Sequence, residues 1–192
     1  EGASALAAVL KETKITNFKL GNNSLTNYGR DMSGLLKLVE ILPQTKIESL
    51  DLSDNNLTNY GRDMSGLLKL VEILPQTKIE SLELGHNNLG AGGAAAIAEG
   101  LKGNSTLLVL DIERNYIGDK GASALAAVLK ETKITELDIA HNNIGAEGAS
   151  ALAAILKETQ ITTLSLQYNG LNGTMAKRAV KDAAGSGVDI QF

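Results

Sequence analysis

The sequence predicts an α/β solenoid in which a short strand and a helix alternate along the chain. Three observations support this fold class. First, one pattern of three apolar residues, an Asn and a fourth apolar residue recurs six times in register. Second, between copies the apolar residues change from alternation, which is typical of a strand, to spacings of three and four, which are typical of a helix. Third, successive copies begin 32, 32, 28, 27 and 27 residues apart, a spacing typical of repeat proteins.

The strand pattern is clearest in the copy built from Ile134, Leu137, Ile139, Asn142 and Ile144. Its alternating residues predict a strand with one buried face. The six copies, and so the six predicted repeats, begin at Ile15, Ile47, Ile79, Leu107, Ile134 and Ile161. Parallel strands lie about 4.8 Å apart whereas helices are about 10 Å wide, so we expect the strand side to be concave and the helix side convex.

The segments between strands predict helices. In 148–156, Leu152 is followed by Ile155 and Leu156 at spacings of three and four, on one helical face. Five extra residues in each of the first two full repeats lengthen either the loop or the start of the helix, and Pro43 and Pro75 stop the helices that follow. We expect one domain, 1–192, opening with a truncated helix (1–14) and closing with a helix and short strand (174–192).

Composition narrows the function classes. The 192 residues are 43% apolar, with a net charge of −4 and no Cys. A mild acidic balance argues against nucleic-acid binding, and no apolar run is long enough to span a membrane. Without Cys there are no disulfides, thiolate metal sites or Cys nucleophiles. With no leader-like segment, a cytoplasmic location is expected.

Two long segments of the sequence recur without a change, and these repeats indicate how the chain arose. Residues 25–50 recur unchanged as 57–82, and residues 2–16 recur unchanged as 121–135. Packing could keep the residues at core positions identical, but packing does not restrict the identity of exposed residues such as Arg30 and Arg62. The copies therefore indicate either an engineered or idealised protein, or a natural fragment with recent duplications.

The repeat pattern resembles the ribonuclease-inhibitor-like class of leucine-rich repeats, and segments 51–57 and 145–152 resemble repeats of NOD-like receptors. The resemblance implies a right-handed horseshoe with parallel strands on the concave face and helices on the convex face, used mostly to bind proteins. The 32-residue repeats depart from the length typical of this class. Two natural alternatives follow from the resemblance: a cytosolic NOD-like-receptor-type sensor, or a small-GTPase regulator, because Ran GTPase-activating proteins share the repeat class.

Each strand pattern ends in an Asn whose amide is expected to bond backbone groups at the bend, a structural role. These residues are Asn23, Asn55, Asn87, Asn115, Asn142 and Asn169.

Carboxylates are concentrated on the predicted concave face, with Lys19 at one end. They are Asp51, Glu83, Asp111, Glu113, Glu136 and Asp138. Adjacent strands would bring them to roughly 5 Å, close enough to repel and to raise some pKa values. This acidic stripe either captures a basic protein partner or simply keeps an open sheet solvated.

Arg114, His141 and Tyr168 share one repeat position, as does His86, and Arg and Tyr often anchor interfaces. They are the best single candidates for binding, against the alternative of a solvent-exposed loop face. The two His would lie roughly 10 Å apart, too far to share a metal ion. We expect no catalytic, cofactor or metal site, because neither a nucleophile nor a phosphate loop is visible. The open strand edge near residues 1–20 also predicts homodimerisation.

Overall fold

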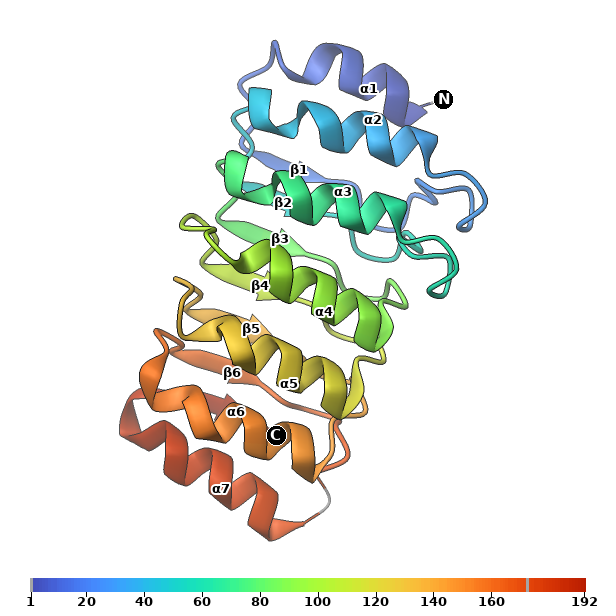
Figure 1. Ribbon diagram of the computed structural model, residues 1–192. Helices are drawn as coiled ribbons and strands as arrows, with labels where there is room; N and C mark the ends of the chain where they lie inside the picture. Colours follow the sequence, from blue (N-terminus) through green and yellow to red (C-terminus); the bar gives the residue numbers. More distant parts are fainter. Residues whose placement is uncertain (1, 172) are drawn as a thin grey trace.

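In the computed structural model, which describes residues 2–171 and 173–192, seven strands form one open parallel sheet (Figure 1). Each strand pairs with the next one in the sequence, so the sheet order is β1 to β7. The strands are β1 (Asn17–Lys19), β2 (Ser49–Asp51), β3 (Ser81–Glu83), β4 (Val109–Asp111), β5 (Glu136–Asp138), β6 (Thr163–Ser165) and β7 (Asp189–Gln191). The predicted alternation of strand and helix is confirmed.

Helices alternate with the strands and form a second layer on one side of the sheet (Figure 1). They are α1 (Gly2–Leu10), α2 (Ser33–Ile41), α3 (Ser65–Ile73), α4 (Gly90–Leu101), α5 (Gly118–Leu129), α6 (Ala146–Ile155) and α7 (Thr174–Ala184). Short 3₁₀ turns follow four of them, at Leu42–Gln44, Leu74–Gln76, Leu156–Glu158 and Gly185–Gly187. Within residues 2–171 and 173–192 no helix covers the other side of the sheet, and we call this side the concave face.

The core lies between the two layers and repeats with the sequence pattern. In the β5 repeat, Leu137, Ile139 and Ile144 are at most 1% exposed, and Leu125 of α5 and Leu152 of α6 are fully buried. Burial depends on having neighbouring repeats on both sides, because the helix of one repeat covers the next. The inner positions of the strand pattern are therefore fixed by packing, and the residues between them are left free on the concave face.

Close helix contact requires small residues at particular points. A Cβ at Gly121 of α5 would lie 2.6 Å from the Cβ of Ile117 and 2.9 Å from the Cβ of Ala94 in α4. Both distances are shorter than real Cβ contacts, so α4 and α5 can pack this closely only because position 121 is Gly.

The extra residues of the long repeats lie in the loops before α2 and α3. Each of these helices has 9 residues, whereas α4 and α5 have 12, so the insertion lengthens the loop and not the helix. The loop is tied to the next repeat by Thr26, whose hydroxyl donates to the carbonyl oxygen of Asn55 at 2.8 Å. Both α2 and α3 end two residues before a Pro, at Ile41 and Ile73.

Within the described residues, no helix has the length and hydrophobicity that crossing a bilayer requires.

Candidate functional site

The candidate site is positioned by a ladder of Asn side chains at the ends of the strands. Asn115 is typical: its Nδ2 donates to the carbonyl oxygens of Leu84 (2.9 Å), Ile112 (3.0 Å) and Glu113 (3.0 Å). Its Oδ1 accepts the backbone N–H of Asn87 (2.9 Å) and that of Leu89 (3.2 Å). One amide thus provides hydrogen-bond partners for backbone groups of two consecutive repeats, and these bonds fix the direction of the chain at the bend after each strand.

Equivalent inter-repeat bonds are made by Asn55, Asn87, Asn142 and Asn169. Asn23 is the exception, because it is exposed and its Nδ2 donates, among the residues described, only to the carbonyl oxygen of Gly21, at 2.9 Å.

The acidic residues of the concave face lie in register across four strands. Asp51 pairs with Glu83, Glu83 with Asp111, and Asp111 with Asp138, in a column that starts at Lys19 and continues into Ser165 and Gln191. We call Asp51, Glu83, Asp111 and Asp138 the acidic column. Glu136 belongs to the neighbouring column, beside Val109 and Thr163, and is exposed.

Each Asp of the acidic column is held by the backbone that follows it. Oδ1 of Asp51 accepts the N–H of Ser53 at 2.9 Å, and Oδ1 of Asp111 accepts that of Glu113 at 2.8 Å. Asp138 makes the same bond with Ala140, at 2.8 Å. Across residues 2–171 and 173–192 none of the four side chains forms an ion pair. Their negative charge therefore remains available on this face.

Asp111 lies at the centre of the column. Burial raises the pKa of this carboxyl to about 6, and repulsion from Asp138, Glu113 and Glu83 adds to the shift, while the N–H of Glu113 opposes it. The prediction that crowding would raise a pKa on this face holds at Asp111, but the principal cause is burial and not mutual repulsion. The concave face here is hollowed by a groove of about 260 Å³ whose lining includes Glu83, Asp111 and Asp138.

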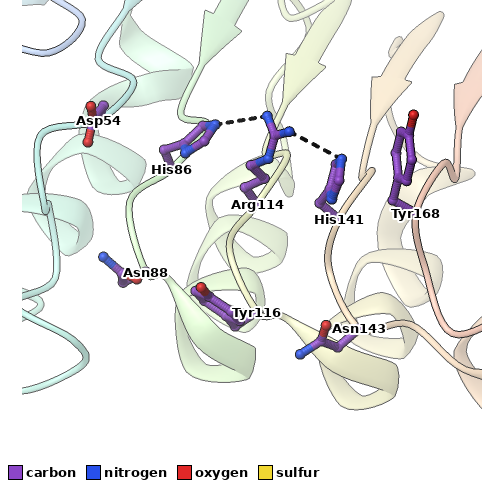
Figure 2. A pocket seen from close by; sticks show the side chains of 8 residues that line it. All are labelled: Asp54, His86, Asn88, Arg114, Tyr116, His141, Asn143 and Tyr168. Atoms are coloured by element: carbon purple, nitrogen blue, oxygen red, sulfur yellow. Dashed lines mark hydrogen bonds between the residues drawn. The ribbon is translucent and has the colours of Figure 1, made fainter.

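A second row of side chains follows the strands, three residues beyond the acidic column. It comprises His86, Arg114, His141 and Tyr168, and we call it the Arg114 row (Figure 2). The Arg114 guanidinium lies between the two imidazoles: Nη1 is 3.2 Å from Nε2 of His86, and Nη2 is 3.3 Å from Nε2 of His141. The Tyr168 ring stacks on His141, with ring centroids 4.2 Å apart and planes inclined by 14°.

Glu113 connects the two rows. Its Oε1 lies 3.3 Å from Nη1 of Arg114 and 3.5 Å from Nε2 of His86. Of the residues predicted to form the acidic stripe, Glu113 is therefore the one whose charge is offset by a neighbour. In the described part of the chain no group of three or more His, Asp and Glu residues is placed to hold a metal ion.

The structure brings together Arg114, His141 and Tyr168, which the sequence predicts as candidates, and adds residues that the sequence reasoning missed. Tyr116, Asn88 and Asn143 line the same groove, which has a volume of about 360 Å³. Each lies two residues after a member of the Arg114 row in the sequence. Each also directly follows the structural Asn of its repeat, and this constant position in the repeat is the signal that could have identified them.

Comparisons with known proteins agree with the observed architecture. The sequence model of the family described as "Leucine Rich repeat" matches residues 44–63, 76–98, 103–126 and 130–153. No curated protein matches the chain by sequence.

Three solved structures share the fold. The leucine-rich repeat-containing protein LegL7 from Legionella pneumophila is 20% identical with a TM-score of 0.64, over 95% of this chain and 58% of LegL7. Leiomodin-1 actin-binding site 2 is 18% identical with a TM-score of 0.54, over 95% of this chain and 86% of that one. The Caenorhabditis elegans tropomodulin C-terminal domain is 16% identical with a TM-score of 0.60, over 78% of this chain and 90% of that one. The chain thus spans less than two thirds of LegL7, and these likenesses concern the fold.

Proposed function

The chain is a leucine-rich repeat protein, and we propose that it is a non-catalytic protein-interaction scaffold whose acidic concave face binds a basic segment of a partner protein. The observation that carries the proposal is the acidic column: four carboxylates in register on adjacent strands, none of them in an ion pair within the described residues. Uncompensated charges of one sign on one face attract a partner of the opposite sign and accelerate its association.

The shape of this face supports the same function. The seven strands, separated by about 4.8 Å, span roughly 29 Å, which suits an interface of standard size. The Asp carboxylates are held by backbone N–H groups, so little side-chain freedom is lost when a cation binds. The leiomodin-1 structure carries the name of an actin-binding site, but at 18% identity we transfer no specific partner from it.

The test is a charge reversal with a matched control. In one variant Asp51, Glu83, Asp111 and Asp138 are all changed to Lys; in the control, Glu40, Glu72, Glu99 and Glu131 of the exposed convex surface are changed to Lys. Both variants undergo the same change in net charge. Binding of a labelled Lys-Gly repeat peptide is measured by fluorescence anisotropy at low and high salt, with circular dichroism to check folding.

We expect the parent and the convex variant to bind the peptide, with affinity falling as salt rises, and the concave variant to lose at least tenfold in affinity. An equal loss in both variants would mean that net charge alone governs binding, and the concave face would then have no special role. The parent is also tested for capture of a natural partner from a lysate. If the concave variant alone loses that partner, the result favours a natural receptor. If the parent binds the basic peptide but captures no natural partner, the result favours an engineered or idealised origin.

Self-association is a separate prediction. The edge strand β1 pairs only with β2 among the described strands, and nearby apolar side chains are open, with Leu6 39% and Val9 58% exposed. The identical residues Leu125 and Val128 are at most 4% exposed in their repeat. We expect the 192-residue chain to dimerise at high concentration and Val9→Lys to weaken the dimer, as measured by light scattering. A monomer mass for the parent at every concentration would refute this.

A further inference from the structure

We propose that Arg114, clamped between His86 and His141, binds an acidic side chain of the partner segment whose basic side chain meets the acidic column. This inference rests on the proposed function and makes it more specific. The partner is then a short, flexible segment that carries a basic and an acidic residue close together in its sequence, and the two rows of the face bind one each.

The clamp fixes the position of the Arg114 guanidinium. A guanidinium can only donate hydrogen bonds, so Nε2 of His86 and Nε2 of His141 must both accept. The two imidazoles thus hold the guanidinium in place without adding a negative charge to it.

One edge of the Arg114 guanidinium is left open. Glu113 is the only carboxylate within ion-pair distance of Arg114 among the described residues, and it contacts only Nη1, through Oε1 at 3.3 Å. The Nε–H of Arg114 and the second hydrogen of Nη2 make no hydrogen bond in the part of the chain described. Guanidinium N–H pairs of this kind bind carboxylates with charge-assisted bonds.

The surrounding groove has the size and lining for one polar side chain. It has a volume of about 360 Å³, and the amides of Asn88 and Asn143 flank Tyr116 beneath the guanidinium (Figure 2). Tyr116 and Tyr168 are 63% and 73% exposed, so their hydroxyls are accessible to a ligand. The acidic member of the lining, Asp54, lies at the far end of the groove, beyond His86 (Figure 2).

Backbone conformation also marks this row. His86, Arg114, His141 and Tyr168 all have a left-handed backbone, with φ values of 58°, 51°, 52° and 54°. Left-handed geometry is strained for a non-Gly residue, and Asn or Asp tolerates it best. The equivalent positions of the first repeats hold Asn22 and Asp54. Arg, His and Tyr at these strained positions therefore point to a role for their side chains.

The spacing of the two rows defines the ligand. Arg114 follows Asp111 by three residues, across the bend that ends β4. A short, flexible partner segment can bring two side chains to both rows, because glycines between them let both side chains turn to the same side. The matching motif is a Lys or Arg followed, three residues later, by an Asp or Glu.

The test is a double-mutant cycle with defined peptides. Acetyl-Lys-Gly-Gly-Glu-amide and acetyl-Lys-Gly-Gly-Gln-amide are titrated into the parent and into Arg114→Gln. The control variant is Arg62→Gln, the same change at an exposed loop position. Binding is followed by NMR, including the Nε–Hε signal of Arg114. Arg114→Lys keeps the positive charge but loses the planar set of guanidinium N–H donors. It provides a second variant in case Gln disturbs the clamp.

We expect the Glu peptide to bind the parent and Arg62→Gln about threefold to tenfold more tightly than the Gln peptide, and to shift the Arg114 Nε–Hε signal. The preference should vanish in Arg114→Gln and shrink in Arg114→Lys. If both peptides bind the parent equally while charge reversal of the acidic column still abolishes binding, the Arg114 proposal fails and the proposed function stands.

Two further arms separate the remaining outcomes. Acetyl-Gly-Gly-Glu-amide lacks the basic residue; if it shifts the Arg114 signal while no Lys peptide interacts with the acidic column, the anion site stands and the proposed function fails. Inorganic phosphate tests a free anion, and a shift with phosphate but with none of the Glu peptides would overturn the peptide assignment. If none of the ligands moves the Arg114 signal, the site is refuted.

Discussion

Replacing Asn115 with Ala is expected to lower the free energy of unfolding by about 3–5 kcal/mol. The Asn115 side chain is fully buried and forms five hydrogen bonds with the backbones of two repeats. Without it, buried carbonyl and N–H groups at the bend lose their partners, and each such group costs about 1–3 kcal/mol. Urea unfolding followed by circular dichroism at 222 nm measures the loss.

Asn23→Ala is the matched control, because it removes the same amide from an equivalent repeat position. Asn23 is exposed and its Nδ2 makes a single bond, so we expect a loss below about 1 kcal/mol. Asn115→Asp should be as damaging as Asn115→Ala near neutral pH, because an oxygen would then face three carbonyl oxygens. Similar stabilities for Asn115→Ala and Asn23→Ala would show that the ladder contributes no inter-repeat stability.

The contrast between Asn115 and Asn23 also illustrates what the sequence can predict. Both residues occupy the same position of the pattern, and from that position a structural bond at the bend was predictable. The number of bonds was not, because it depends on which repeats lie on each side. The fold was predictable for a related reason: strand, bend and helix recur in register, so each weak local signal is repeated six times.

The candidate site was only partly predictable. Strand register follows from the repeat, so the acidic column could be predicted from Asp51, Glu83, Asp111 and Asp138 alone. Contacts in the Arg114 row depend on side-chain rotamers and on the left-handed backbone, which the pattern does not specify. Strand spacing predicts a separation of roughly 10 Å for the two His, but it does not predict the guanidinium that bridges them.

The same limit applies to Asp111. Its neighbours were predictable from register, whereas its burial depends on the depth of the concave groove around it. That burial, and not the repulsion that the sequence suggested, is the main reason for its raised pKa.

Replacing Asp111 with Asn is expected to stabilise the protein by about 1–2 kcal/mol near pH 7.5 and to change its stability little near pH 4. The pKa of this carboxyl rises from 3.8 to about 6 on folding, mainly through burial. One pKa unit corresponds to about 1.4 kcal/mol, and we reduce the full value because partial exposure lets water screen the charge. Asn keeps an oxygen for the N–H of Glu113 and carries no charge.

The sign follows from proton binding. Because the pKa is higher in the folded protein than in the unfolded chain, the folded state binds the proton more tightly. The resulting contribution to stability is complete below about pH 4 and is lost as pH rises through about 6. Asn at this position is neutral at every pH, so the advantage of the variant over the parent should grow between pH 4 and pH 7.

Urea unfolding at several pH values measures this difference, and Asp51→Asn is the matched control. Asp51 occupies the same column and accepts the same kind of backbone bond, from Ser53, but it has Lys19 on the adjacent strand. We expect a smaller gain there, because one of its two neighbours in the column is Lys19 and not a second carboxylate, so it meets less repulsion. An equal gain for both variants at pH 7.5, or a gain for Asp111→Asn that persists at pH 4, would contradict the assignment. The first result would mean that the acidic column is more uniformly solvated than the burial of Asp111 indicates, so that binding of a basic segment would relieve less repulsion at its centre. The second would mean that the gain does not come from the charge of the carboxylate.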